Sequence, residues 1–265
     1  MVGMAEFSSH QLFFFFLLLA LLPIATRGSE SLLYQQCEKN FTQNDKLQEN
    51  INNVLLDMVA KSSLQGYAIS SYATNTCESV YGVTRCEPDM SVKECSSCIT
   101  RAAQKIRTTC PDSAESRIWY DNCFLHYDTN NFIGKADKSY AVVWFSFYAA
   151  ANPKAFEQAL GELMGEVIAE TAQGRKKFGY GENYANEIKL TVYGMAQCTR
   201  DLGERECNEC LETGLEIMTD LCKDQVGCRL FGSSCAIRYE IYKFSSFTST
   251  DDGAAAAPAP SPSIF

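Results

Sequence analysis

Histidine is nearly absent from this 265-residue sequence, which contains only His10 and His126. His10 lies in the N-terminal segment that is predicted below to be a signal peptide, so one histidine at most remains for chemistry. Nucleophilic hydrolysis needs a serine or cysteine beside a histidine base, and the sequence offers no such arrangement around His126. We interpret His126 as an ordinary strand residue. The sequence therefore predicts a protein that is not an enzyme and needs no cofactor.

The sequence also lacks an excess of basic residues. It has 23 Lys and Arg against 32 Asp and Glu, which gives a formal net charge of -9 at pH 7. A protein that binds nucleic acid needs a basic face to meet the phosphates. The charge therefore argues against a nucleic-acid partner and is otherwise that of an ordinary soluble surface.

Long apolar runs are missing except at the N-terminus. Residues 12–22 are apolar, and small residues follow as far as Gly28. This run is too short to span a bilayer, so we predict a signal peptide over residues 1–28 that is cleaved near Gly28. The shorter apolar segment 141–148 predicts a buried strand. We therefore expect a secreted, extracellular chain with no membrane span after cleavage.

Two further features agree with export. Residues 254–265 consist largely of Ala, Pro and Ser, which predicts a disordered tail over residues 248–265. This tail lacks the hydrophobic stretch that a lipid-anchor signal needs. Asn40-Phe41-Thr42 is the one sequon for N-glycosylation, and its use requires the secretory route. We therefore predict Asn40 as a glycosylation site.

The strongest positive feature is an internal repeat. When the chain is shifted by 112 residues, five cysteines coincide without a gap: Cys86, Cys95, Cys98, Cys110 and Cys123 fall on Cys198, Cys207, Cys210, Cys222 and Cys235. The same shift aligns Arg117 with Arg229 and Tyr127 with Tyr239. Such agreement indicates a tandem duplication, and each copy is long enough to bury a core of its own. We predict two domains, over residues 29–136 and 137–247.

Periodicity predicts helices in each copy. Residues 44–62 carry an apolar stripe at helical spacing, and their counterpart begins at Pro153 behind the capping residue Asn152. A second helix is expected over residues 92–109 behind a capping box of Ser91 and Glu94. Its counterpart begins near Gly203, which is a poorer cap.

Strand patterns occur at residues 66–72 and 80–85. We expect each unit to close with a hairpin-like pair: residues 117–128 with residues 140–148 in the first unit, and residues 229–244 in the second. Helices packed on an antiparallel sheet form an α+β sandwich, which is the predicted fold class.

The cysteine spacing C-x8-C-x2-C allows three interpretations. The two C-x2-C pairs could bind zinc, but they lie far apart in the sequence, histidine ligands are lacking and cysteines would be left over. They could form reactive dithiols, but the same spacing sits inside a larger fixed framework of cysteines. Structural disulfides suit units of this size outside the cell, where each contributes about 2–4 kcal/mol. We favour the third interpretation and predict no metal site.

Thirteen cysteines cannot all pair. The five shared cysteines of each unit need a sixth partner, which the first unit can find in Cys37 or Cys77. The second unit has only Cys228 to offer. One cysteine must therefore remain unpaired.

Taken together, these motifs resemble a known family. The tandem C-x8-C-x2-C pattern behind a signal peptide, with IWYDNC at residues 118–123, QCTRDL at 197–202 and CAIRYEIYKF at 235–244, is similar to plant cysteine-rich repeat secretory proteins. Their domain is the ginkbilobin-2-homologous or stress-antifungal domain, formerly DUF26. The resemblance covers about residues 29–247. Relatives add a transmembrane segment or a kinase after the pair, and this sequence shows neither, so we expect the secreted form, located in the plant apoplast.

The resemblance implies a fold and a pairing of the cysteines. Each domain should place helices on a five-stranded antiparallel sheet. The implied disulfides are Cys37–Cys110, Cys86–Cys95, Cys98–Cys123, Cys198–Cys207 and Cys210–Cys235. The two cysteines that remain in the second domain can pair with each other in a local Cys222–Cys228 bridge. Cys77 is then the unpaired cysteine.

The resemblance also implies a carbohydrate site. Ginkbilobin-type members bind mannose through an asparagine after the first cysteine, an arginine before the last and an acidic residue after the last. In the first domain Glu38 stands at the asparagine position, while Arg117 and Asp128 match the other two. In the second domain Arg229 and Glu240 match. Trp119 and Trp144 are expected in packing rather than in a sugar platform.

Two functions follow as hypotheses from these features. The first is an apoplastic binding module for plant defence or stress, with possible partners among mannose-type glycans and an antifungal role. The alternative is an interaction partner of membrane receptors or plasmodesmal proteins that share the same tandem domain.

Overall fold

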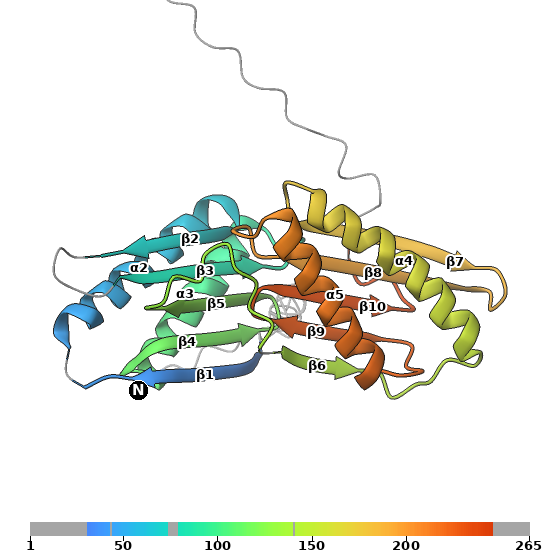
Figure 1. The fold of residues 1–265 in the computed structure, drawn as a ribbon, viewed down its shortest axis with the longest axis horizontal. Coiled ribbons are helices and arrows are strands. Elements are labelled where there is room, and N and C mark those ends of the chain that lie inside the picture. Colours follow the sequence, from blue (N-terminus) through green and yellow to red (C-terminus); the bar gives the residue numbers. More distant parts are fainter. Residues whose placement is uncertain (1–30, 43, 74–78, 140, 246–265) are drawn as a thin grey trace, which may run out of the picture. The chain divides into compact units, whose positions relative to one another are not determined.

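The computed structural model describes residues 31–42, 44–73, 79–139 and 141–245. The predicted signal peptide, Cys77 and the tail over residues 248–265 lie outside these ranges. The described residues form two similar repeats, each with two helices and a five-stranded antiparallel sheet (Figure 1).

The first repeat contains seven elements. They are β1 (Leu32–Asn40), α2 (Asp45–Gln65), β2 (Tyr67–Tyr72), β3 (Val80–Cys86), α3 (Val92–Thr109), β4 (Ser113–Tyr120) and β5 (Cys123–Asp128). Its strands lie in the order β1-β4-β5-β3-β2, and every neighbouring pair is antiparallel.

The second repeat has the same succession. It consists of β6 (Ala141–Phe145), α4 (Pro153–Gln173), β7 (Phe178–Ala185), β8 (Leu190–Cys198), α5 (Glu204–Leu221), β9 (Cys228–Gly232) and β10 (Cys235–Glu240). Its strand order, β6-β9-β10-β8-β7, matches that of the first sheet position by position. The predicted α+β class, with two tandem domains of helices on five-stranded antiparallel sheets, is confirmed.

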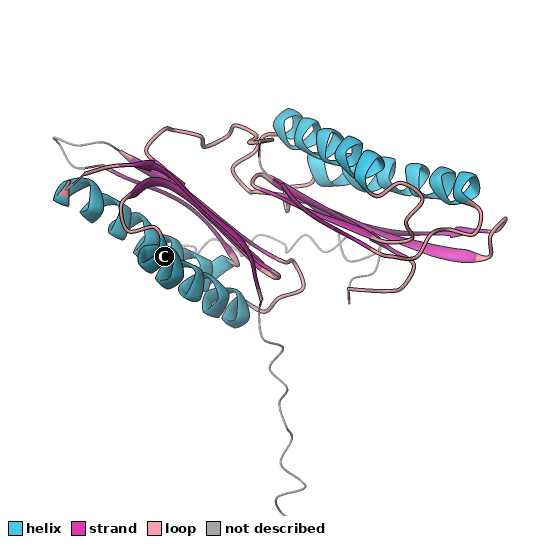
Figure 2. Cartoon of the chain, turned by 90° about the horizontal axis from the view of Figure 1, so that it is seen from below, coloured by secondary structure: helices cyan, strands magenta, loops and turns pink. Residues whose placement is uncertain are grey.

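In each repeat both helices cover the same face of the sheet (Figure 2). The core of the first repeat lies between them: Val54 and Ile106 from the helices meet Ile118 and Leu125 from the sheet. Because strand side chains alternate between faces, the residues between these core positions point to the other side. That side, here called the helix-free face, carries the candidate functional residues.

Local sequence explains where the helices begin. Asn44 and Asn152 cap α2 and α4 through their side chains, and Pro153 occupies the first position of α4. Ser91 and Glu94 form the predicted capping box of α3. Gly203 begins α5 without a side-chain hydrogen bond, as expected of a poorer cap. Gly66 ends α2 at a φ of 76°, a left-handed conformation that glycine adopts without strain.

Six disulfides lie within the described residues, three in each repeat. They join Cys37 to Cys110, Cys86 to Cys95, Cys98 to Cys123, Cys198 to Cys207, Cys210 to Cys235 and Cys222 to Cys228. These are the pairs that the resemblance and the local-bridge argument implied. Four of them have the same sequence separations in both repeats, 9 and 25 residues, as a duplication requires.

One strand pairing differs from the sequence prediction. We expected residues 140–148 to close the first unit against residues 117–128. Instead β4 pairs with β5, and β6 pairs with β9 as the outer strand of the second sheet. An apolar strand pattern fixes which face of a strand is buried, but it does not name the neighbouring strand. β6 thus corresponds to β1 and opens the second repeat.

No helix in the described part of the chain combines the length and the apolar character that a membrane span requires.

Candidate binding site on the first repeat

Seven ionisable side chains gather on the helix-free face of the first sheet. We call them the charged cluster: Glu38, Lys39, Glu115, Arg117, His126, Asp128 and Asp137. The strand register explains most of the gathering, because Glu115 lies opposite both Glu38 and Asp128, while Arg117 lies opposite His126. Glu115 and Arg117 are two residues apart on β4, so they share a face.

Arg117 is the centre of the charged cluster. Its guanidinium pairs with the carboxylate of Glu115, with Asp137 Oδ2 at 2.9 Å and with Glu38 Oε2 at 3.4 Å. The side chain of Arg117 is only 6% exposed. A buried cation needs such anionic partners, because leaving water is costly for a charge. Arg117 therefore anchors three acidic side chains from three segments of the chain.

Lys39 supplies the second cation. Its φ of 54° places the backbone in the left-handed region and interrupts the alternation of β1, so that Lys39 joins its neighbour Glu38 at the cluster. The Lys39 ammonium lies 2.6 Å from Glu115 Oε2 and 2.7 Å from Asp128 Oδ1. Burial lowers the pKa of Lys39, but its bonds to Asp128 and Glu115 raise it more strongly, and the net shift is upward.

The accessible part of the cluster is formed by Glu38 and Lys39. Their side chains are 32% and 38% exposed, whereas those of Glu115 and Asp128 are almost fully buried. Asn40, the predicted glycosylation site, directly follows Lys39 on β1 and is exposed. A ligand that approaches this face would therefore meet Glu38 and Lys39 first.

His126 lies beneath the cluster as a buried strand residue of β5, in agreement with the sequence interpretation. Its ring stacks on Phe132 with 4.1 Å between ring centroids. Nε2 of His126 lies 3.6 Å from Glu115 Oε1, too far for a strong hydrogen bond. Burial lowers the pKa of His126 below its usual value and outweighs the opposing effect of Glu115, so the ring is neutral at neutral pH.

The pKa of Glu115 is also lowered, but here the neighbouring groups outweigh burial. Burial raises the pKa of its carboxyl, but the neighbouring His126, Lys39 and Arg117 lower it more, to about 2. Glu115 is therefore ionised at neutral pH.

Glu115, His126 and Asp128 also resemble a set of metal ligands, since one donor atom from each lies within 4.8 Å of the others. The two carboxylates already pair with the Lys39 ammonium, and Glu115 pairs with Arg117 as well. The arrangement is a compensated ion cluster, in which Lys39 stands beside the oxygens that a cation would use.

In the second repeat the predicted residues have separate partners. Arg229 bonds Glu87 Oε1 at 3.0 Å and the backbone oxygen of Asp121 at 2.8 Å, both in the first repeat. Glu240 pairs with Arg238 at 3.1 Å. Among the described residues no contact joins Arg229 to Glu240. The structure thus brings Glu38, Arg117 and Asp128 into one cluster but does not do so for Arg229 and Glu240.

The two tryptophans differ in their surroundings. Trp119 is buried, its ring packs against Phe124 with 5.0 Å between centroids, and its Nε1 donates to the backbone oxygen of Gly232 at 3.3 Å. Trp119 is thus a packing residue, as expected from the sequence, and its hydrogen bond reaches the second repeat. Trp144 is half-exposed on β6 and meets Phe231 edge-on at 5.8 Å between centroids. The prediction of a buried strand over residues 141–148 was therefore wrong: the strand ends at Phe145, and it is an outer strand whose aromatic side chains are partly exposed.

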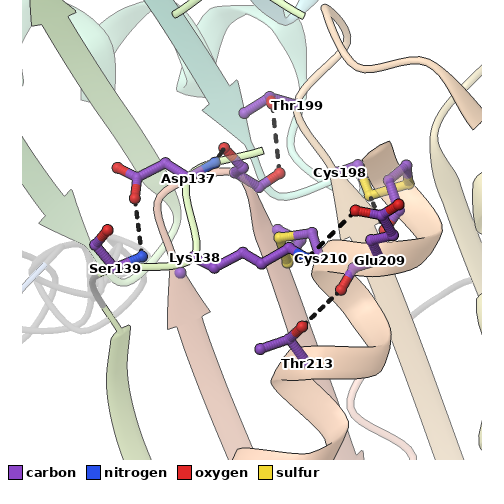
Figure 3. Close-up of a disulfide and its surroundings, with 12 residues drawn as sticks. Asp137, Lys138, Ser139, Cys198, Thr199, Glu209, Cys210 and Thr213 are labelled. Atoms are coloured by element: carbon purple, nitrogen blue, oxygen red, sulfur yellow. Dashed lines mark hydrogen bonds and ion pairs between the residues drawn. A yellow bond between two sulfur atoms is a disulfide. The ribbon is translucent and has the colours of Figure 1, made fainter. Parts of the chain in front are cut away.

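Residues 129–139, which follow β5, cover the charged cluster and continue onto the second repeat. Phe132 stacks on His126, Asp137 pairs with Arg117, and the backbone N–H of Asp137 donates to Ser234 Oγ at 2.8 Å. Figure 3 shows Lys138 extending toward Glu209 on α5, beside the disulfide of Cys210; the two charges lie 3.4 Å apart. The segment is therefore held at both repeats.

Sequence reasoning missed Lys39, Glu115 and Asp137 as members of the cluster. Glu115 could have been found, because it lies two residues before Arg117 and shares its face of β4. Lys39 and Asp137 gave no such signal, because one depends on a left-handed backbone and the other on the path of a connecting segment.

The cysteines of the C-x2-C motifs do not pair with each other. Cys95 and Cys98 bond Cys86 and Cys123, and the second repeat repeats this arrangement. All of these sulfurs belong to buried residues of the two cores. Within the described residues the motifs are therefore structural and do not form reactive dithiols.

Comparison with known protein families agrees with this architecture. A family model described as salt stress response/antifungal matches the chain twice, over residues 35–130 and 146–242. The matches correspond to the two repeats.

Two relatives match over nearly their whole length. Cysteine-rich repeat secretory protein 55 of Arabidopsis thaliana is 37% identical over 235 residues, which cover 86% of this chain and 88% of the relative. An antimicrobial ginkbilobin-2-like protein of Castanea crenata is 29% identical over 231 residues, covering 86% and 95%.

Among solved structures, the tandem DUF26 ectodomain of the Arabidopsis thaliana cysteine-rich receptor-like protein PDLP8 matches with a TM-score of 0.69 and 25% identity. It covers 81% of this chain and all of that one.

Proposed function

The chain belongs to the salt stress response/antifungal family, and on this premise we propose that it is an apoplastic binding module that takes mannose-type glycans on its first repeat. The observation that supports the proposal is the gathering of Glu38, Arg117 and Asp128 from three strands onto one face. The same tandem domain forms the ectodomain of a cysteine-rich receptor-like protein, which fits a role without catalysis.

In this proposal the buried and the accessible residues of the charged cluster have different roles. Sugar hydroxyls are bound by carboxylates, ammonium groups and guanidinium forks. Because Arg117 and Asp128 are buried, their part is to fix the two accessible groups: Arg117 holds Glu38, and Asp128 holds Lys39. Glu38 then accepts hydrogen bonds from sugar hydroxyls, and Lys39 donates to them. Defence against fungi would follow from recognition of mannose-rich surfaces.

A glycan array with the secreted protein tests this proposal. Glu38→Gln should weaken binding to mannose-type glycans about tenfold, because a charge-assisted hydrogen bond becomes a neutral one. Glu212→Gln on the exposed side of α5 is the matched control and should bind like the wild type. Thermal unfolding of both variants shows whether the fold is intact. If the wild type binds no mannose-type glycan, the proposal is wrong.

A second candidate function is favoured by a separate observation. Four aromatic residues are exposed along the outer strand of the second sheet and just after it: Trp144, Phe145, Phe147 and Tyr148. Phe147 and Tyr148 expose 94% and 78% of their surface. Contiguous exposed aromatics mark interaction surfaces. We propose a receptor ectodomain with the same tandem domain as the partner, since such ectodomains occur among the structural neighbours.

A purified tandem ectodomain of this kind, immobilised on a sensor, tests the second candidate. Phe147→Ala with Tyr148→Ala should reduce binding at least tenfold, as expected when central aromatic contacts of an interface are lost. Tyr184→Ala, which removes an exposed aromatic residue from β7, is the control and should bind normally. Equal binding by all three proteins would exclude this surface.

A further inference from the structure

A pocket of about 300 Å³ lies where the first and second repeats meet. We call it the junction pocket. The first repeat contributes residues around the end of β3, including Tyr67 and Arg85, and the second contributes residues of β7, β8 and the turn after β8. It is separate from the charged cluster, with which it shares no lining residue.

Buried polar atoms without partners concentrate at the junction pocket. Nη1 of Arg85, the hydroxyl of Tyr180 and Oε1 of Gln197 are each buried and have no hydrogen-bond partner. All three residues line the pocket, and each side chain is at least nine-tenths buried. A buried polar group without a partner costs about 1–3 kcal/mol, so three at one place point to a ligand that supplies the missing bonds.

The charge of the junction pocket is opposite to that of the whole chain. Its lining includes Arg85, Lys176 and Arg200, against the single carboxylate of Glu87. Glu87 already pairs with Arg229 at 3.0 Å. Because the chain carries a formal net charge of -9, an excess of cations around the junction pocket is not expected from the composition alone. The junction pocket therefore favours an anionic ligand.

The hydrogen-bonding groups add a second requirement. Nε2 of Gln197 donates to the backbone oxygen of Cys86 at 2.9 Å, which fixes the amide and leaves Oε1 to accept from a ligand donor. Tyr180 stays protonated at neutral pH, because burial raises the pKa of its hydroxyl to about 12. The ligand must therefore bear at least one donor for Gln197 and one acceptor for Tyr180, in addition to its charge.

Flat and rigid walls complete the site. The guanidinium of Arg200 lies over the ring of Tyr67 at 5.1 Å, so a charged fork stands beside an aromatic face. The disulfides Cys86–Cys95 and Cys198–Cys207 begin at two strand ends that line the pocket. A wall that is already ordered loses little entropy when a ligand binds.

We propose that the junction pocket binds a sugar acid, a single sugar unit that carries hydroxyl groups and one carboxylate. The carboxylate lies toward Arg85 and Arg200, one hydroxyl donates to Gln197, and another oxygen accepts from Tyr180. An aromatic acid would satisfy the charge, but its flat ring carries fewer hydroxyls for these polar groups. The site is independent of the mannose site and extends binding to a second, anionic ligand class.

Calorimetric titration of the secreted protein with D-galacturonic acid tests the proposal, with D-galactose as the matched neutral sugar. Galacturonate should bind at least tenfold more tightly than galactose, because only galacturonate carries the carboxylate. 4-Hydroxybenzoate is the third probe. Absence of galacturonate binding, equal binding of the two sugars, or binding of 4-hydroxybenzoate in preference to both would each overturn the proposal.

Two variants locate the site. Tyr180→Phe removes a hydroxyl that bonds nothing within the protein, so galacturonate affinity should fall about tenfold while thermal stability is kept or raised. Arg200→Gln should also lower the affinity about tenfold, because it removes one cation of the pocket. Tyr184→Phe, on the same strand, and Arg205→Gln on α5 lie outside the pocket and serve as matched controls. If the controls lose as much affinity as the pocket variants, the site is wrongly placed.

The outcome is separable from that of the proposed function. Tyr180→Phe and Arg200→Gln leave the charged cluster untouched, so mannose binding should be unchanged in both variants. Conversely, Glu38→Gln should leave galacturonate binding intact.

Discussion

His126 links the charged cluster to pH. Its pKa is lowered in the folded protein, chiefly by burial, whereas in the unfolded chain it lies near its ordinary value of about 6.5. As the pH falls below this value, His126 binds a proton in the unfolded chain but not in the folded chain. The histidine's contribution to stability is therefore complete above about pH 6.5 and is lost as the pH falls toward the lowered folded value.

The prediction is that the free energy of unfolding decreases between pH 7 and pH 5, and that His126→Gln flattens this slope. One titrating group changes the slope by at most about 1.4 kcal/mol per pH unit. Urea denaturation at several pH values measures the effect. The same slope in wild type and variant would show that His126 does not govern it.

Glu115 affects stability at lower pH than His126. Because its pKa is about 2 in the folded protein, its contribution to the free energy of unfolding fades as the pH falls below about 4.5.

Arg117 should be the most sensitive residue of the charged cluster. Arg117→Met removes a buried cation and leaves Glu115 without its buried partner, so we expect a loss of about 3–5 kcal/mol in the free energy of unfolding. Arg205→Met removes an arginine that is 79% exposed and should leave stability nearly unchanged. Chemical denaturation compares the two. A small loss for Arg117→Met would show that the cluster contributes little to the fold.

At the scale of residues, the sequence named three residues that the structure brings together, while their role in binding stays a prediction. Glu38, Arg117 and Asp128 were identified through the family pattern around the cysteines, and they do lie in one cluster. The pattern could not show that Arg117 and Asp128 are buried under their own counter-ions. Burial of a charged residue depends on the segment that covers it, here residues 129–139, whose path leaves no periodic signal.

At the scale of elements, the two equivalent helices α3 and α5 begin differently. Ser91 accepts from the backbone of Glu94 at α3, whereas Gly203 offers α5 no side chain. We predict that Ser91→Ala lowers the free energy of unfolding by about 1 kcal/mol. Gly203→Ser should raise it by a few tenths, because glycine is a tolerable cap. Thermal unfolding followed by circular dichroism measures both changes. A larger effect at Gly203 than at Ser91 would contradict this ranking.

Helices were easier to predict from the sequence than sheet neighbours. The observed bounds of α3 are those expected, because a capping box and an apolar stripe both act within a few residues. The placement of β6 was wrong because strand pairing joins distant residues. In the strand register, Gln36 lies opposite Arg117 as Trp144 lies opposite Arg229, so β1 and β6 correspond at an offset of 108 residues rather than 112. The ungapped comparison of cysteines could not reveal it.

At the scale of the whole molecule, contacts between the repeats should make them unfold together. Phe231 of the second repeat joins Val83, Trp119 and Phe124 of the first in one buried apolar cluster. Arg229, also on β9, reaches Glu87 in the first repeat. Two domains that share such a cluster are expected to behave as one cooperative unit.

Phe231→Ala tests this coupling. Truncating a buried phenylalanine costs about 3–5 kcal/mol, and here the loss falls on the contact between repeats. We expect scanning calorimetry to give a single transition for the wild type and two resolved transitions for the variant. The control is Phe156→Ala, which removes a buried phenylalanine from the interior of the second repeat. A single transition in Phe231→Ala would mean that other contacts suffice for the coupling.

The backbone oxygen of Gly232 accepts hydrogen bonds from both Arg85 and Trp119. This acceptor is part of the main chain, so no substitution at position 232 can delete it. After a gene duplication, the side chains of the two repeats are free to diverge. A hydrogen bond to a backbone oxygen keeps its acceptor during that divergence, whereas its side-chain donor can still be lost. The contact between the two repeats is thus partly insulated from mutation, so their side chains can diverge while the repeats remain attached to each other.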